Sequence, residues 1–129
     1  MFDPVWRTVT GRQDPSDPGR LNGYAIYRVR GETYPGIVPS DGSDALVNGC
    51  VYWDLDGPTV ERLDRFEGEF YRRIPVSVDV MGGRPAACEA YVVRPSFTHI
   101  LSRKPWSAQW FETHGLQAFL SSYKGFRSL

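Results

Sequence analysis

The chain has 129 residues, of which 41% are hydrophobic, and its 15 basic residues balance its 15 acidic ones. A chain of this length favours one domain over residues 1–129, because two domains would each be too small to bury a proper core. The balanced charge disfavours nucleic-acid binding, which normally requires a basic excess. No apolar stretch approaches the roughly 20 residues of a membrane-spanning helix. We therefore expect neither nucleic acid nor a membrane as a partner.

The compartment is predicted from the cysteines and from the first residues. Cys50 and Cys88 are the two cysteines, too few for the disulfide framework of a small secreted domain. The first residues lack the charged and then apolar regions of a secretion signal. Together these features predict a reduced, cytoplasmic protein.

The first part of the chain predicts a helix, a loop and several strands. Asp3 is a good helix N-cap, Pro4 suits the first helical turn, and Gly11 can end the helix. Residues 13–19 consist of turn-forming types and predict an exposed loop. Runs rich in strand-forming residues follow at 24–30, 34–39, 45–55, 70–80 and 86–93. A tight connection at 81–84 predicts that the last two runs form a hairpin.

Two further helices are predicted from apolar residues at helical spacing, one over 57–67 and one from Ser107 to about Tyr123. Gly115 lies in the middle of the second helix and predicts a break there. The order of elements predicts an α+β fold with a small mixed, mostly antiparallel sheet flanked by helices. Closing such a sheet into a barrel would protect its short strands from exposed edges.

Most motifs of catalysis and of metal binding are absent from the sequence. It contains no glycine-rich dinucleotide or phosphate loop, no nucleophile elbow and no H-E-x-x-H pair. His99 and His114 have no second histidine or cysteine at metal-ligand spacing. We therefore expect no metal site.

Glu67 departs from the pattern of the helix predicted over 57–67. Val60, Leu63 and Glu67 fall at i, i+3 and i+7, which places the carboxylate on the stripe that should face the core. Glu61 and Asp64 instead fit a solvated face. Apolar surroundings disfavour the charged form of a carboxylate, and the negative end of the helix dipole acts in the same direction. Both effects raise the pKa of Glu67 toward the range of a general acid or base.

A purely structural role for Glu67 is equally compatible with the spacing. The side chain could cap the end of the helix, or it could pair with Arg72 or Arg73 at the start of the next strand. Spacing alone does not separate this role from a catalytic one.

The stretch Leu63-Asp64-Arg65-Phe66-Glu67-Gly68, followed by Tyr71-x-Arg73, resembles the gamma-glutamylcyclotransferase-like superfamily, and more narrowly its plant avirulence-induced-gene type. Residues 34–39 and 47–52 match further segments of that family in the same order. The resemblance implies a small barrel flanked by helices, with a cavity at its mouth. It also implies an enzyme that cyclises a γ-glutamyl amine or peptide to 5-oxoproline, without a metal or an organic cofactor.

The resemblance assigns roles to particular residues. Glu67 matches the family's single catalytic glutamate, which takes a proton from the substrate's α-ammonium and delivers one to the leaving nitrogen. Tyr34, Gly36 and Tyr71 fall in the matching segments and are predicted to bind substrate. The partner is therefore expected to be a small γ-glutamyl compound.

One part of the family pattern does not match. Members open with a strand ending in Y-G-[ST]-L, whose loop supplies backbone N–H groups to the substrate, and Met1 stands where the residue after that motif should be. We therefore expect the first strand and its loop to be missing. The alternative function is a non-catalytic member of the same fold that binds a small ligand or a protein. An in-frame upstream extension that encodes the missing strand would favour the enzyme.

Overall fold

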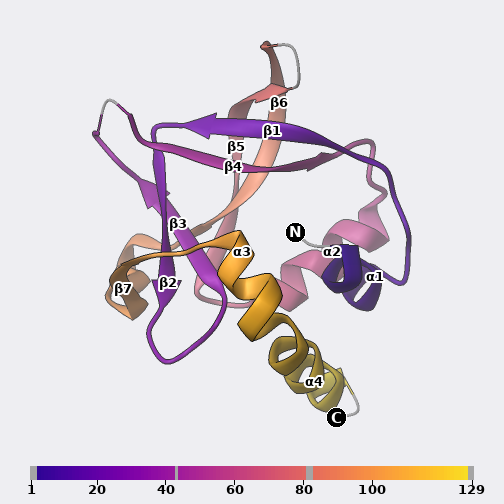
Figure 1. Ribbon diagram of the computed structural model, residues 1–129. Helices are drawn as coiled ribbons and strands as arrows, with labels where there is room; N and C mark the ends of the chain where they lie inside the picture. The colour runs from indigo at the N-terminus through magenta and orange to yellow at the C-terminus, as the bar shows by residue number, and fades with distance from the viewer. Residues whose placement is uncertain (1–2, 43, 81–82, 128–129) are drawn as a thin grey trace.

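Two antiparallel sheets form the scaffold of the protein (Figure 1). The computed structural model describes residues 3–42, 44–80 and 83–127. The larger sheet has the strand order β4-β1-β5-β6 and is built from β1 (Ser16–Asn22), β4 (Leu46–Tyr52), β5 (Tyr71–Val80) and β6 (Arg84–Val93). The smaller sheet has the order β3-β2-β7 and is built from β2 (Tyr24–Val29), β3 (Pro35–Pro39) and β7 (Leu101–Pro105). All strand pairs between described residues are antiparallel, and the predicted α+β class is confirmed.

The predicted closure into a barrel is wrong, because the two sheets stay separate. The chain passes from one sheet to the other at Gly23, the single residue between β1 and β2. Gly23 has φ +81°, a left-handed conformation that favours glycine. The sharp change of direction there sends two consecutive strands into different sheets, as at the corners of other two-sheet folds.

The predicted loop at 13–19 is wrong in its second half, which belongs to β1. Pro18 has no N–H to donate, and the strand tolerates it because β1 pairs with β5 only at Gly19 and Arg20. A Cβ atom at Gly19 would lie 2.8 Å from Val78 Cγ1 and 3.0 Å from Val51 Cγ2. Pro18 and Gly19 therefore lie in a strand that packs closely against its neighbours and not in a turn.

Helices flank the two sheets (Figure 1). Helix α1 (Asp3–Thr10) lies beside α2 (Gly57–Glu67), as Figure 1 shows at the right of the molecule. The C-terminal helical segment begins as α3 (Ala108–Trp110), passes through a π-helical turn, and continues as α4 (Leu116–Arg127). A short 3₁₀ helix, η1 (Pro95–Ile100), precedes β7. No helix in the described part of the chain is long and apolar enough to cross a membrane.

The π-helical turn ends at Gly115, where the sequence predicts a break. The helix changes its winding there and does not stop. A Cβ atom at Gly115 would lie 2.8 Å from Thr33 Cβ and 3.0 Å from Phe111 Cδ2. Close packing of this turn against the β2–β3 loop therefore accounts for the glycine.

Three groups of buried apolar side chains hold the elements together. The first joins α1 to α2 and contains Val5, Trp6, Val9 and Leu63. The second lies among β2, β5, β6 and β7 and contains Val29, Tyr71, Val93 and Leu101. The third lies within the larger sheet and contains Leu21, Val51 and Val78. Tyr91 packs against both the first and the second group and so connects the helices to the strands.

Gly36→Ala should destabilise the protein by about 1–3 kcal/mol, the usual cost of overpacking a core. A Cβ atom at Gly36 would lie 2.5 Å from Val93 Cγ2 and 2.9 Å from Leu101 Cδ2. Urea denaturation measures the free energy of unfolding. Gly49→Ala is the matched control, since a Cβ atom at that strand glycine meets nothing within 4 Å. Equal stability of the two variants would contradict the described packing.

Candidate functional site

Helix α2 has well-defined ends that determine where Glu67 lies. Its N-cap is Asp56, whose Oδ1 accepts a hydrogen bond of 2.8 Å from the Thr59 backbone N–H. The helix ends at Gly68, which has φ +80° and donates its N–H to the Asp64 carbonyl at 3.1 Å. The helix predicted over 57–67 is thus confirmed, and Glu67 occupies its last turn.

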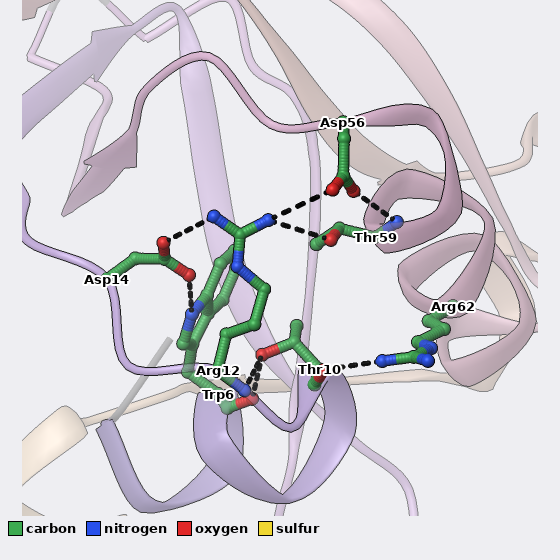
Figure 2. A network of polar contacts seen from close by, with 7 residues as sticks. All are labelled: Trp6, Thr10, Arg12, Asp14, Asp56, Thr59 and Arg62. Carbon is green, nitrogen blue, oxygen red and sulfur yellow. Dashed lines mark hydrogen bonds and ion pairs between the residues drawn. The ribbon is translucent and has the colours of Figure 1, made fainter.

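A polar network connects the start of α2 to the segment that follows α1 (Figure 2). The Arg12 guanidinium donates to Asp14 at 2.8 Å and to Thr59 Oγ1 at 3.0 Å. It also forms an ion pair with Asp56 at 3.5 Å. Arg12 therefore links the N-cap of α2 to the chain between α1 and β1.

The same network extends to the middle of α2 and to the sheet. Arg62 Nη1 donates to the carbonyl of the buried Thr10 at 2.7 Å, which joins α2 to the end of α1. Trp6 Nε1 donates to Asp14 Oδ2 at 2.8 Å, and the Trp6 ring stacks on Tyr52 of β4 with ring centroids 3.6 Å apart. Helix α1 is thereby held against α2, as Figure 2 shows, and its Trp6 ring is also held against the sheet.

A cavity of about 550 Å³ lies between the larger sheet and α2. Its aromatic lining comes from Trp6, Tyr52, Trp53 and Tyr91. Its charged lining comes from Asp54, Glu67, Arg73 and Glu89. An apolar cavity with a few convergent polar groups is the common form of a small-molecule site.

Glu67 is half-buried in the wall of this cavity, whereas Glu61 on the same helix is exposed. Burial raises the pKa of Glu67 from its ordinary value of 4.5 to about 7, because a carboxylate loses hydration among protein atoms. Arg73 pairs with other carboxylates, and Arg72 lines a separate cavity. Within the described residues, then, neither arginine is the partner of Glu67.

The structure brings Tyr71 close to both Glu67 and Tyr34. Tyr71 is 8% exposed, and its hydroxyl donates to the Pro35 carbonyl at 3.0 Å. Burial raises the pKa of Tyr71, and the negative charges of Glu67 and Tyr34 add to the effect. Gly36 is buried, and a Cβ atom there would lie 3.6 Å from Tyr71 Cε1. Tyr34, Gly36 and Tyr71 are not among the residues that line the cavity beside Glu67. Substrate binding by these residues stays a prediction.

A second set of site residues was not predicted from the sequence. Asp64, expected on a solvated face, accepts hydrogen bonds from Arg73 Nε at 3.1 Å and from the Tyr91 hydroxyl. Arg73 Nη1 donates to both carboxylate oxygens of Glu89, at 2.7 and 2.8 Å. The signal that could have revealed the set is the hairpin register, in which Arg73 is opposite Tyr91. No three metal-ligating side chains in the described part of the chain lie together as a metal site.

The fold is that of a gamma-glutamylcyclotransferase-like domain. The sequence model described as "Gamma-glutamyl cyclotransferase, AIG2-like" matches residues 1–111, and the chain belongs to that family. Two Arabidopsis thaliana relatives illustrate the similarity. "Protein AIG2 A" is 41% identical over 59 residues, which are 46% of this chain and 34% of the relative. "Protein AIG2 C" is 34% identical over 74 residues, which are 57% of this chain and 44% of the relative.

Solved structures show the same fold over nearly the whole chain. One Arabidopsis thaliana protein, determined in solution, superposes with a TM-score of 0.70 at 24% identity, covering 98% of this chain and 75% of its own. A second superposes with a TM-score of 0.68 at 22% identity, covering 98% of this chain and 84% of its own. The curated relatives, by contrast, are matched over about a third to less than half of their length.

The raised pKa of Glu67 predicts how stability depends on pH. The folded protein binds this proton more tightly than the unfolded chain, so stability falls as pH rises from 4.5 to about 7. Each pKa unit corresponds to about 1.4 kcal/mol, so the loss above pH 7 reaches about 3 kcal/mol. Glu67→Gln should therefore be more stable than the wild type at pH 8, by as much as this amount, and nearly equal to it at pH 4.

Chemical denaturation at the two pH values measures this difference. Glu61→Gln is the control, because that carboxylate is exposed and its replacement should leave the pH dependence unchanged. A Glu67→Gln variant with the same pH dependence as the wild type would show that Glu67 titrates normally.

Proposed function

We propose that the protein is a gamma-glutamylcyclotransferase-type enzyme that converts a γ-glutamyl amine or peptide to 5-oxoproline and releases the amine. The observation that carries the proposal is a carboxylate with a pKa of about 7 in the wall of a cavity. Glu67 is that carboxylate, and the resemblance of residues 63–73 to the family motif supports its role as the catalytic glutamate. Membership in the family supports the reaction class. The cytoplasmic location stays a prediction from the sequence.

The reaction is an intramolecular acyl transfer. The substrate's α-nitrogen attacks its own γ-carbonyl carbon, the new C–N bond closes the five-membered ring, and the bond from that carbon to the leaving nitrogen breaks. The α-ammonium carries three protons and the ring nitrogen keeps one. Two protons therefore move, and the released amine ends as an ammonium ion. No water is consumed.

Glu67 is the general acid and base in this scheme. Ionised, it takes a proton from the α-ammonium and frees the nitrogen lone pair for attack. Protonated, it returns a proton to the leaving nitrogen, so that an amine departs and not an amide anion. A pKa near 7 suits both roles at neutral pH, because the group is then about half protonated.

The rest of the site holds the substrate in the folded conformation that brings nitrogen and carbonyl together. Well-oriented intramolecular reactions gain a large effective concentration, so positioning supplies much of the rate. Tyr71, which interacts with both Glu67 and Tyr34, is a proposed substrate contact together with Tyr34, and Gly36 packs against the Tyr71 ring. Neither a metal nor an organic cofactor has a role in this proposal.

Incubation with γ-glutamyl amines or γ-glutamyl dipeptides should release 5-oxoproline, measured by chromatography, and EDTA should not change the rate. Glu67→Gln keeps the shape of the side chain but cannot accept the proton. It should therefore lose about 10²–10⁴-fold in rate, the usual contribution of general acid–base catalysis. Glu61→Gln, on the exposed face of α2, is the matched control and should retain activity.

The assay is run on the 129-residue chain and on the chain extended by any residues encoded in frame upstream. Wild-type turnover by Glu67→Gln would rule out the proton-transfer role. Failure of both forms to convert any γ-glutamyl compound would favour a member of the family that binds a ligand or a protein without chemistry.

A further inference from the structure

Arg73 is a cation in the same cavity as Glu67, the carboxylate that the proposed function requires to be unpaired. Both side chains line the same cavity, and Arg73 is the single cation among the described residues of that lining. Asp64, which binds Arg73, precedes Glu67 by three positions on α2. Side chains at this spacing are neighbours on one face of a helix, with Cβ atoms about 5–6 Å apart. Arg73 is therefore held by a carboxylate that neighbours Glu67 on α2.

Two carboxylates from different elements hold the Arg73 guanidinium in place. Asp64 on α2 accepts from Nε at 3.1 Å, and Glu89 on β6 accepts from Nη1 at 2.7 and 2.8 Å. The Tyr91 hydroxyl donates to the Asp64 oxygen that Arg73 binds and so restrains that carboxylate. Charge-assisted hydrogen bonds of this kind are strong and directional. The guanidinium is thus bound on two sides before any substrate arrives.

The exposure of these groups argues against a mainly stabilising role. The Arg73 side chain is 35% exposed, that of Asp64 41% and that of Glu89 51%. Ion pairs this exposed contribute little to the free energy of unfolding. The main effect of these ion pairs is instead to fix the position of the Arg73 guanidinium.

We propose that Asp64 and Glu89 are positioning residues that hold the Arg73 guanidinium away from the Glu67 carboxylate. The catalytic meaning of this arrangement rests on the proposed function, because a general base paired with a cation would be a poor proton acceptor. In the described chain, the titratable side chains of other elements that interact with Glu67 are Tyr71 on β5 and Tyr91 on β6, and Asp54 before α2 lines the same cavity. None of these three is a cation, and the positive charge that lowers the pKa of Glu67 is that of the N-terminal amino group, not that of Arg73.

The experiment measures the titration of Glu67 directly by carboxyl carbon NMR, with the resonance assigned by its loss in Glu67→Gln. Asp64→Asn/Glu89→Gln releases Arg73, and the pKa of Glu67 should then fall by about 1–3 pH units, as for a carboxylate that gains a nearby cation. Arg73→Gln alone should leave the pKa at its wild-type value or above it. The triple variant should show a much smaller fall than the double variant.

The triple variant separates two causes of such a fall. Removing Asp64 and Glu89 also removes negative charge near Glu67, which lowers its pKa whether or not Arg73 moves. An equal fall with and without Arg73, or no fall at all, would overturn the proposal. Glu61→Gln controls for the loss of a carboxylate on the same helix that does not bind Arg73. If the double variant does not fold, Glu89→Gln alone should give a smaller fall of the same sign, and its absence would overturn the proposal.

The titration needs no substrate, so its result is independent of the enzyme assay. A fall that depends on Arg73 in a protein without turnover would support the positioning and refute the proposed function. Turnover together with an unchanged pKa of Glu67 in the double variant would support the proposed function and refute the positioning role. In an active protein, the acid limb of the kcat/KM profile should move to lower pH in the double variant, by the same amount as the pKa.

Discussion

The burial of one carboxylate at the end of α2 is the constraint on which the site depends. The last helical turn points Glu67 toward the sheet because Val60 and Leu63, on the same stripe, must be covered. Removing a carboxylate from water costs free energy, and the fold tolerates this cost in the wall of its cavity. The polar network around Arg12 and Arg62 holds α2 against α1 and so maintains that burial. The burial that raises the proton affinity of Glu67 therefore also lowers the stability of the folded protein at pH values at which Glu67 is ionised.

The surroundings of Glu67 combine apolar walls with an arginine that is already paired with two carboxylates. Trp6 and Tyr52 stack on one side, which keeps α1 closed over the sheet. On the other side, Arg73 is matched by carboxylates from both neighbouring elements. A cavity built in this way raises the pKa of Glu67 and keeps the Arg73 guanidinium paired with other carboxylates. The site differs in this respect from a simple acidic patch, in which no single carboxylate has a distinct environment.

The sequence predicts well those features that depend on local pattern. Helical spacing places Glu67 beside Leu63, and alternation with a tight connection predicts the hairpin of β5 and β6, both of which the structure contains. Features that depend on distant partners were missed. Pro18 and Gly19 indicate a turn unless one knows that Val51 and Val78 approach them closely. Likewise, Asp64 resembles a surface residue until α2 is placed against the strand that carries Arg73. The corner at Gly23, where the chain leaves one sheet for the other, is another such feature, because local pattern does not distinguish it from a hairpin turn.

The hairpin of β5 and β6 also bears on the order in which the site assembles. Its strands are adjacent in sequence and pair over ten positions each, so little chain entropy is lost in bringing them together. We expect this hairpin to form early during folding, before the more distant pairing of β1 with β4. Arg73 and Glu89 both belong to it and lie on diagonal positions across the two strands. Arg73 therefore meets one of its two carboxylate partners within the hairpin itself, and only Asp64 has to be supplied by the packing of α2 against β5.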